Sequence, residues 1–369
     1  MKIEKVQIKN FKSLRDIEIE LRGLTLLTGV NSSGKSSFIQ ALLLLKQNED
    51  RFFSLRGNKI ANINDINKYV RLGNKKDILY EGAFKENIEI SIFGNKSSHS
   101  LIFEHETLQI EFTELLPEEI EKTFNIFYDD FQYITTDRIA PDISYKLSDE
   151  HISQNIIGIQ GEYTAHYLAQ NAHKKLDIEA LKLPQAITNH LLENVSLWLA
   201  EISNGITVNA KLYNELQQVN LTYSYVYGKN KTSEYSPLNV GFGLTYVLPI
   251  IVAILKAKAG DLLIIENPES HLHPAGQSKI AQMCALAVAN GVQIIVESHS
   301  DHFLNAIRVA TKQHILEPEN SLIYYFSKLS DSMETKVEQL LIDENGNINE
   351  NWPEGFFDEY RNLLDELLW

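Results

Sequence analysis

The sequence predicts an α/β fold with a mixed sheet and helices on both of its faces. Near the N-terminus, an apolar run at residues 24–28 is followed by a loop rich in Gly and Ser and then by helical spacing from Ser36. After residue 240, apolar helices alternate with the short apolar runs 262–265 and 292–296. Runs that are apolar throughout are typical of parallel strands buried on both faces, and their alternation with helices is typical of βαβ units.

The individual elements can be justified in chain order. Residues 2–9 and 16–21 alternate between apolar and polar side chains, which predicts two strands that each expose one face. Residues 24–28 predict a buried parallel strand, and the apolar residues after Ser36 recur at the spacing of a helix. Past residue 240 we expect a helix at 245–258, a strand at 262–265, a helix at 277–289 and a strand at 292–296.

The middle of the chain, residues 51–235, is less regular. It contains no sustained heptads, which excludes a long coiled-coil arm, so we expect a compact and largely helical insertion that can serve dimerisation. The pieces that stand out are strand-like runs at 88–93, 108–112 and 133–136 and helices at 163–172 and 187–202.

The charge of the chain is concentrated in two segments. The 369 residues carry a formal net charge of −15, with 44% hydrophobic residues, so the chain is long and apolar enough for a folded core. Residues 104–130 hold nine acids and one Lys, and residues 343–369 hold eight acids and one Arg, which together account for the whole net charge. Composition therefore excludes a histone-like or tail-driven DNA binder, but it allows a local basic surface. The acidity suggests a basic protein partner.

Cysteine use and hydropathy point to a cytoplasmic protein with no membrane partner. The one cysteine, Cys284, excludes an internal disulfide and a cysteine-based zinc site, and its apolar helical surroundings predict that it is buried. Residues 1–10 lack the apolar core of a signal peptide. The longest uncharged run, residues 240–255, is too short and too interrupted by Gly and Pro to span a bilayer.

The strongest motif is a phosphate loop. Residues 29–36 read GVNSSGKS and match G-x-x-x-x-G-K-[ST] between a buried strand and a helix. The backbone N–H groups of such a loop wrap the phosphates of a nucleotide, Lys35 bridges the outer phosphates, and the Ser36 hydroxyl ligates Mg²⁺. We therefore expect ATP with Mg²⁺. The predicted nucleotide-contacting residues are Gly29, Asn31, Ser32, Ser33, Gly34, Lys35, Ser36 and Ser37.

A second group of candidate residues follows two later strands. Glu266 ends the buried run that starts at Leu262, and the carboxyl ends of parallel strands gather at one edge of a sheet. Glu266 is therefore expected beside Ser36, where it would complete the Mg²⁺ ligands. His299 follows the next buried strand, a position suited to sensing the γ-phosphate.

A transition-metal site is the rival interpretation of the same region. Imidazole and carboxylate groups are suitable metal ligands. The phosphate loop already explains the neighbouring acids, which disfavours this alternative and the metal-dependent hydrolase it would imply. Its candidate ligands are His271, His273, Glu297, His299 and His302.

Taken together, these motifs resemble the ABC-type ATPase heads of the SMC/RecF/OLD group. The resemblance covers roughly residues 1–50 and 236–310, and a further segment, NWPEGFFD, resembles the short C-terminal module of unknown function found on one subfamily of predicted ATPases. It rests on an N-terminal strand motif at 8–14, a signature motif at 239–244, a Walker B and D-loop at 264–274, an H-loop at 298–300 and the C-terminal module at 351–358.

The resemblance implies a division of the chain. An ABC-type head would comprise residues 1–50 and 236–342, and a Q-loop lobe with the insertion would occupy 51–235. Residues 343–369 would form an acidic, amphipathic C-terminal module. The Q-loop is not placed, although Arg71 and Arg138 are candidates for a lid near the nucleotide. For Arg138 a surface ion pair is the favoured interpretation.

The resemblance also implies a mechanism. In such heads two protomers sandwich ATP head to tail, so we expect a homodimer or higher oligomer in which Asn239, Gly241 and Gly243 contact the γ-phosphate held by the other protomer. Glycine lets a backbone approach a phosphate closely at a helix start, whereas a tight turn before a buried helix is the plain alternative.

Two departures from the family pattern bear on function. The usual catalytic Glu after the Walker B acid is here Asn267, which can orient a water but cannot take its proton. Glu269 could act instead, or hydrolysis could be slow. About 70 residues follow the H-loop, too few for the Toprim nuclease domain of OLD-type proteins, so any cutting is expected from a partner.

Two functions remain in view. The first is an ATPase that regulates an effector encoded nearby, a nuclease or toxin, in anti-phage defence, as in the OLD and Septu systems. The second is a RecF-like repair ATPase that binds DNA directly. The C-terminal end either packs on the head or docks a partner, because one predicted helical face carries Phe356, Tyr360, Leu363, Leu364 and Leu367.

Overall fold

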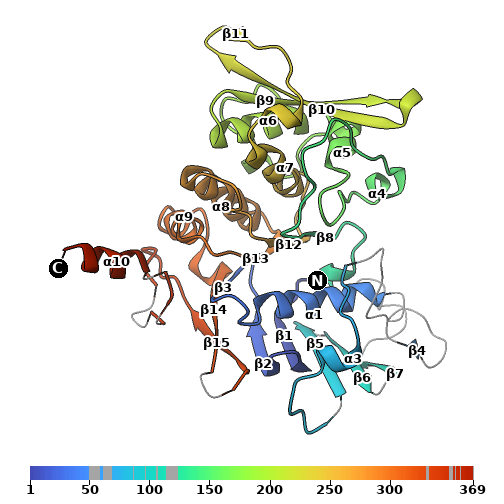
Figure 1. Ribbon diagram of the computed structural model, residues 1–369, viewed down its shortest axis with the longest axis vertical. Helices are drawn as coiled ribbons and strands as arrows, with labels where there is room; N and C mark the ends of the chain where they lie inside the picture. The colour runs from blue at the N-terminus through green and yellow to red at the C-terminus, as the bar shows by residue number, and fades with distance from the viewer. Residues whose placement is uncertain are drawn as a thin grey trace. The chain divides into compact units, whose positions relative to one another are not determined.

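The computed structural model of the chain divides into two compact units (Figure 1). Unit 1 consists of Met1–Tyr128, Ser321–Leu341 and Ile348–Trp369, and unit 2 of Asp129–Asn320 and Ile342–Asn347. The residues that the structure describes are 1–49, 59–60, 69–85, 87–95, 97–104, 107–113, 124–329, 332–348, 352–353, 355–357 and 359–368.

Unit 1 contains an antiparallel sheet in the order β2-β1-β5-β6-β7-β4. Its N-terminal strands alternate as predicted, because Val6 and Ile8 are fully buried while the residues between them are half-buried. Ile8 pairs with Ile17 on one side and with Ile90 on the other, so one face of the sheet is a continuous apolar surface. The strands are β1 (Lys5–Phe11), β2 (Leu14–Glu20), β4 (Lys59–Ile60), β5 (Asn87–Gly94), β6 (Ser97–Glu104) and β7 (Thr107–Thr113).

A second set of strands in unit 1 carries the phosphate loop. β3 (Leu24–Gly29) pairs in parallel with β14 (Ser321–Lys328), which pairs antiparallel with β15 (Thr335–Leu340). Helix α1 (Lys35–Gln47) starts from the loop after β3 and contacts β1, β3 and β5, so it packs against both sets of strands. Within the described part of unit 1, the other α-helices are α3 (Lys75–Ile78) and α10 (Glu359–Leu368).

Unit 2 is built around three buried parallel strands. β8 (Gln132–Ile134), β12 (Leu262–Glu266) and β13 (Gln293–Glu297) run side by side, with Ile264 paired to both Tyr133 and Ile295. Helix α7 (Phe242–Leu255) precedes β12, α8 (Pro274–Ala289) joins β12 to β13, and α9 (Asp301–Lys312) follows β13. α7 contacts β8 and β12, and α8 contacts β13 and α9. Cys284 is buried in α8, as expected.

The remainder of unit 2 is a second sheet with its own helices. α5 (Thr164–Asn171) and α6 (Leu191–Ile202) pack on the antiparallel strands β9 (Ile206–Tyr213) and β10 (Gln218–Tyr227), and α6 also contacts α7 and α8. β11 (Asn230–Lys231) extends β10 as a short hairpin.

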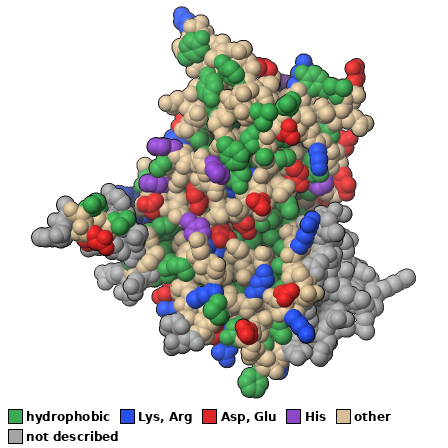
Figure 2. All heavy atoms as spheres, in the orientation of Figure 1, with side chains coloured by type: hydrophobic (Ala, Val, Ile, Leu, Met, Phe, Trp, Pro, Cys, Tyr) green, Lys and Arg blue, Asp and Glu red, His purple; other side chains and the backbone are tan. Residues whose placement is uncertain are grey.

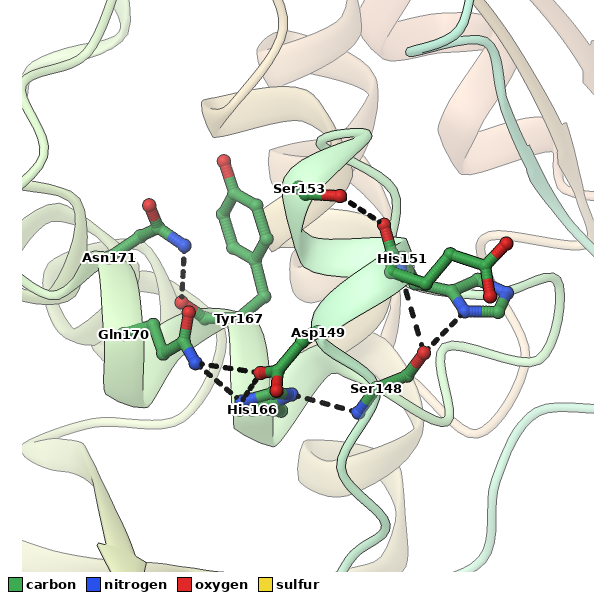
Figure 3. Close-up of polar contacts among 9 residues, drawn as sticks. Ser148, Asp149, His151, Ser153, His166, Tyr167, Gln170 and Asn171 are labelled. Atoms are coloured by element: carbon green, nitrogen blue, oxygen red, sulfur yellow. Dashed lines mark hydrogen bonds and ion pairs between the residues drawn. The ribbon is translucent and has the colours of Figure 1, made fainter.

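The short helix α4 (Asp149–Ser153) is joined to α5 through the buried imidazole of His166 (Figure 3). The Ser148 backbone N–H donates to His166 Nδ1 at 3.1 Å, and Gln170 Nε2 lies 2.8 Å from His166 Nε2. Burial lowers the pKa of His166, although the nearby Asp149 carboxylate opposes the shift. The Ser148 side chain also caps α4, so one residue links the cap to the buried ring.

Most of the predicted elements are confirmed, but the insertion is not largely helical. Strands β4 to β11 and helices α3 to α6 share the described part of residues 51–235. Ile88, Ile90 and Ile92 recur with a period of two and are fully buried, which is the pattern of a strand with one face in the core. The domain boundaries expected at residues 50, 235 and 342 stay predictions.

None of the helices in the described ranges is both long enough and apolar enough to cross a lipid bilayer.

A buried lysine lies at the end of α7. Lys256 is 3% exposed and its Nζ donates to the Asn155 carbonyl oxygen at 2.6 Å. Burial lowers its pKa to about 8, with the carboxylate of Asp261 opposing the shift. Burial raises the pKa of Asp261 to about 6, so the two groups titrate in different pH ranges.

In the Lys256→Met variant the free energy of unfolding should no longer rise between pH 8 and 10 as it does in the wild type. An unfolded lysine has a pKa of about 10.4, so between pH 8 and 10 the unfolded state binds more protons at this position and the folded state gains stability as the pH rises. Urea unfolding at pH 8.0 and 9.5 should show a rise of roughly 1–2 kcal/mol in the wild type that Lys256→Met lacks. The exposed Lys312→Met variant is the control, and a Lys256→Met protein that keeps the full rise would contradict the assignment.

Candidate functional site

The phosphate loop of unit 1 is shaped by two glycines that no other residue can replace without strain. Gly29 ends β3 with φ of 132°, and a Cβ there would collide with the carbonyl oxygen of Phe326 in β14. Gly34 caps α1 with φ of 110°, and its Cβ would lie 2.5 Å from Thr335 Oγ1. Both positions therefore need glycine for its free φ and for the close approach of a neighbouring strand.

The inside of the loop presents positive charge and N–H groups. Lys35 is 3% exposed, and its Nζ donates to the carbonyl oxygens of Gly29 at 3.1 Å and Val30 at 2.9 Å. Ser33 is buried, and its hydroxyl has no hydrogen-bond partner among the residues that the structure describes. Together with the N-terminus of α1, these groups form a site for an anion. Asn31, Ser32 and Ser36 are exposed, and Ser37 is half-buried in the first turn of α1.

Thr335, at the start of β15, fixes this loop from the side. Its hydroxyl lies 2.8 Å from both Ser13 Oγ and the Ser33 carbonyl oxygen, and its backbone N–H donates to the Ser13 carbonyl oxygen at 2.9 Å. Ser13 belongs to the N-terminal motif recognised in the sequence. Thr335 carries no local sequence signal, and only the pairing of β14 with β3 reveals its role.

An open cavity of about 820 Å³ in unit 1 is lined in part by Ser13, the residue whose hydroxyl Thr335 contacts. Lys12 is at its wall, where burial lowers the pKa of the side chain, and its Nζ donates to Gln40 Oε1 of α1 at 2.6 Å. The cavity has three lysines and two acids in its lining together with apolar side chains. Its lining is Lys12, Ser13, Lys76, Asp77, Leu79, Tyr80, Glu81, Gly82, Ala83, Lys328, Ser332 and Met333.

In unit 2, the carboxylate of Glu266 is held by groups from β8 and the loop that follows it. Glu266 Oε1 accepts from the Tyr133 hydroxyl at 3.1 Å. Glu266 Oε2 accepts from the backbone N–H and the hydroxyl of Thr136 at 3.2 and 3.1 Å. Burial and the Glu266 charge raise the pKa of Tyr133, so the phenol stays a donor. The sequence showed the run 133–136 as a strand but gave no sign that it orients the acid.

Arg138 lies beside this acid and is not part of a surface ion pair. It is 6% exposed, its Nη2 donates to the carbonyl oxygens of Glu266 and Asn267, and its guanidinium carbon lies 4.7 Å from the centre of the Tyr246 ring. Burial lowers its pKa to about 10, so it is charged at neutral pH. The expectation of a surface pair is wrong because the strand end, not solvent, surrounds the side chain. In the described structure its Nε and Nη1 atoms have no hydrogen-bond partner.

The two candidates for water activation lie close to this cation. Asn267 has φ of 43° and its Nδ2 donates to Thr136 Oγ1 at 2.9 Å, while its Oδ1 is buried without a partner among the described residues. Glu269 accepts from Ser298 Oγ at 2.9 Å and from the backbone N–H of His299 at 2.7 Å. Burial raises the pKa of Glu269 despite these bonds and the nearby Arg138 charge, which makes it a stronger base than an ordinary glutamate. The side chain of His299 is exposed.

The signature segment meets the D-loop within unit 2. A Cβ on Gly243 would collide with the carbonyl oxygen of His271, so packing inside the unit already explains this glycine. Gly241 is exposed with nothing within 4 Å of a Cβ, and Asn239 is exposed as well. The rings of Phe242, Tyr246 and His271 pack with centres 4.9 to 5.2 Å apart. Tyr246 therefore connects the signature helix to Arg138.

Unit 1 thus brings together the residues of the phosphate loop, and unit 2 brings together Glu266, Asn267, Glu269 and the backbone of His299. The five residues of the alternative transition-metal site do not form a cluster. Nowhere in the described ranges do three His, Cys, Asp or Glu side chains come close enough to hold one metal ion.

The chain is similar to two known families in sequence. Residues 24–305 match the family described as "AAA domain, putative AbiEii toxin, Type IV TA system", and residues 316–367 match "Protein of unknown function (DUF3696)". Over 317 residues, the chain is 23% identical to the DNA replication and repair protein RecF of Caldanaerobacter subterraneus subsp. tengcongensis. The match covers 77% of this chain and 80% of that RecF.

Solved structures show the same fold. The SmcHead bound to the C-winged helix domain of ScpA superimposes with a TM-score of 0.56 at 16% identity, covering 93% of this chain and 99% of that one. The Smc head domain with an extended coiled coil, bound to the C-terminal domain of ScpA from Pyrococcus furiosus, gives 0.50 at 14% identity with both chains fully covered. At these identities the likeness shows an SMC-type head, a P-loop NTPase fold.

The family match spans most of the chain, and it agrees with the phosphate loop and with the strand that ends in Glu266. The chain therefore belongs to the family described as "AAA domain, putative AbiEii toxin, Type IV TA system". It is an ABC-type ATPase of the SMC/RecF group.

Proposed function

We propose that the protein binds ATP with Mg²⁺, dimerises head to tail around it, and so regulates an effector, a nuclease or toxin, in anti-phage defence. The phosphate loop carries this proposal, because a buried Lys35 over a glycine-shaped loop at a helix N-terminus has no simpler purpose than holding phosphates. The family description, with its toxin and Type IV TA system, supports the link to defence.

The residues of the loop fit the nucleotide. Lys35 neutralises the outer phosphates, and the backbone N–H groups of residues 31–35 bind their oxygens. The Ser36 hydroxyl and the Glu266 carboxylate are hard oxygen donors of the kind that Mg²⁺ prefers, and the bound ion would neutralise charge on the β- and γ-phosphates. The open cavity of unit 1, with Lys12, Ser13 and Tyr80 in its wall, is proposed as the place for the nucleoside.

Hydrolysis is assigned to Glu269 with Asn267. The raised pKa of Glu269 suits a general base, and its bond to the His299 backbone places it beside the H-loop. Asn267 orients the water through its amide. Arg138 bonds the carbonyl oxygen of Asn267 and its positive charge acts on Glu269, and such a charge favours the developing negative charge of phosphoryl transfer. Turnover is expected to be slow, because the usual position of the base holds an amide.

Dimerisation is assigned to the signature segment. Asn239 and Gly241 are exposed at the start of α7, where they can meet a phosphate held by a second protomer. An OLD- or Septu-like system then supplies the effector.

A RecF-like repair ATPase that binds DNA itself is the second candidate, favoured by the 23% identity to RecF. DNA affinity that falls steeply with salt would favour it, whereas stable assembly with the product of a neighbouring gene would favour effector control.

The Lys35→Ala variant should lose ATP binding. Removing the ammonium from the phosphates costs at least about 1.4 kcal/mol, which is tenfold in affinity, and isothermal titration calorimetry with Mg²⁺ and ATP measures it. The exposed Lys312→Ala variant is the control. Equal affinity in the wild type and Lys35→Ala would reject the phosphate-binding role.

The Gly241→Asp variant should keep ATP affinity but lose nucleotide-driven dimerisation, because its carboxylate would face the phosphate of the other protomer. Gly241 is preferred to Gly243, where any side chain collides with His271 and would disturb the fold. Sedimentation with a non-hydrolysable ATP analogue gives the readout. Ser233→Asp, an exposed position outside the signature segment, is the control, and a Gly241→Asp protein that still dimerises would exclude the signature role.

The Glu269→Gln variant should lower kcat by roughly 10²-fold or more with little change in ATP affinity, as expected for loss of a general base. Because the base must be deprotonated, wild-type kcat should fall as the pH drops through the raised pKa of Glu269, at a higher pH than an ordinary glutamate would give.

Two further variants separate catalysis from structure at this position. Ser298→Ala removes one bond to Glu269 but keeps its carboxylate, so it should retain most activity. Asn267→Glu restores the usual acid and should raise kcat. Unchanged turnover in Glu269→Gln would rule out Glu269 as the base.

A further inference from the structure

The C-terminal segment contributes to both units in turn. After β15, Ile342–Asn347 belongs to unit 2, and Ile348–Trp369 returns to unit 1. In unit 2 the turn at residues 343–347 is tied to α9, because Arg308 Nε donates to the Gly346 carbonyl oxygen at 2.7 Å. Gly346 has φ of 78°, and a Cβ there would lie 2.5 Å from the Arg308 carbonyl oxygen. Residues 343–347 are therefore packed against α9 as part of unit 2.

In unit 1 the segment is anchored by one buried aromatic side chain. Phe356 is 1% exposed, and its ring lies 5.6 Å from the ring of Tyr325 in β14, at an interplanar angle of 88°. Trp352 and Phe357 add rings at 4.9 and 5.0 Å from Phe356. Edge-to-face ring pairs of this kind stabilise a contact beyond the burial of their area. Phe356 thus precedes α10 and does not share its outer face, contrary to the sequence expectation.

The anchored strand is also the strand that shapes the phosphate loop. Tyr325 pairs with Thr28, and the next residue, Phe326, pairs with Gly29. The ring of Phe326 lies 6.4 Å from that of Phe38 in α1. Phe356 therefore contacts Tyr325, and the neighbouring residue of β14, Phe326, pairs with Gly29, the first residue of the phosphate loop.

Beyond the anchor, α10 presents an apolar face to solvent. Leu363, Leu364 and Leu367 are 49%, 37% and 82% exposed and lie at i, i+1 and i+4 on one side of the helix. The carboxylates of Asp365 and Glu366 are exposed beside them. In the space-filling view, hydrophobic and acidic side chains appear together on this helix at the left edge (Figure 2). A helix of ten residues is marginal alone in water and gains stability by burying such a face.

We propose that α10 is the docking helix for a protein partner with an apolar groove rimmed by lysine and arginine. We propose also that its occupancy is coupled to the nucleotide through the contact of Phe356 with Tyr325. The docking proposal does not depend on the proposed function, while the coupling rests on the proposed binding of ATP. Because coupling between two binding sites is reciprocal, the nucleotide changes the affinity of α10 for its partner by the same factor.

Charge selects a partner protein over a second copy of this chain. The C-terminal residues 343–369 carry eight acids and one Arg, so a basic rim is the complement they require. An apolar groove of this chain runs between α8 and α9, with Val309, Ala310 and Ile315 in its wall. Lys279 also lines that groove, but its Nζ lies 2.6 Å from Glu201 Oε2, so this lysine is already neutralised.

The experiment uses the full chain and a fluorescent amphipathic peptide of leucine and lysine as the probe. Fluorescence anisotropy should show binding that weakens at least tenfold in Leu363→Gln/Leu367→Gln and weakens with salt in the wild type. The Asp365→Lys/Glu366→Lys variant keeps the leucines, and its probe affinity should no longer depend on salt as the wild-type affinity does. Leu216→Gln is the control, since Leu216 is 66% exposed elsewhere in the chain. Equal probe affinity in the wild type and the leucine variant would overturn the docking surface.

Coupling is measured by repeating the titration with a non-hydrolysable ATP analogue. Probe affinity should change about fivefold in the wild type. It should stay constant in Tyr325→Leu, which keeps an apolar residue but removes the aromatic contact. An unchanged affinity in the wild type would overturn the coupling. If sedimentation shows a self-associated chain that Leu363→Gln/Leu367→Gln dissociates, a second copy covers α10 and the partner proposal is wrong.

Calorimetry with ATP distinguishes the two proposals. A wild type that binds no ATP contradicts the proposed function but leaves probe binding as a test of α10. A wild type that binds ATP but not the probe contradicts only the docking surface.

Discussion

The close approach of Gly29 to the backbone of Phe326 is the contact on which the phosphate loop depends. It exists because β3 and β14 pair in parallel, with the last residue of β3 directly opposite Phe326. β14 also leads into β15, whose Thr335 bonds the Ser33 carbonyl oxygen from the other side. The loop is thus held in shape by residues about 300 positions later in the chain.

The acidic residues of unit 2 depend on a different kind of constraint. Glu266 arrives at the end of a buried strand, but its orientation comes from three donors supplied by Tyr133 and Thr136. Arg138 then bonds the carbonyl groups of Glu266 and Asn267. A buried cation with incomplete hydrogen bonding is costly, and such groups are retained where they serve a site. The same guanidinium charge acts on Glu269, which links the strand end to the H-loop backbone.

The structure shows where part of the negative charge of the chain lies. The acidic C-terminal segment contains both an internal anchor, Phe356, and an exposed helix, α10. The anchor contacts the strand next to the phosphate loop, so the segment is a structural neighbour of the nucleotide site and not an appended tail. The match of residues 316–367 to a family of unknown function coincides with this arrangement of β14, β15 and the C-terminal helix.

The sequence by itself determined the features that are encoded locally. A phosphate loop needs glycines at positive φ and a lysine at a helix start, and these are consecutive residues, so the motif, β3 and α1 were all predictable. Strands β12 and β13 followed from short apolar runs, and the candidate residues Glu266, Asn267, Glu269 and His299 followed from their place after those runs.

Only the tertiary structure decided the remainder. Thr335, Tyr133 and Arg138 act through partners more than 100 residues away, and neither periodicity nor motif records such contacts. Gly243 is set by the backbone of His271, a distant residue in sequence. The insertion was misjudged because its strands are stabilised by pairing with other strands, β5 with β1 and β8 with β12, which local helix and strand preferences do not describe. Local conformation is determined by neighbouring residues, whereas the packing that orients a site depends on which distant segments come into contact.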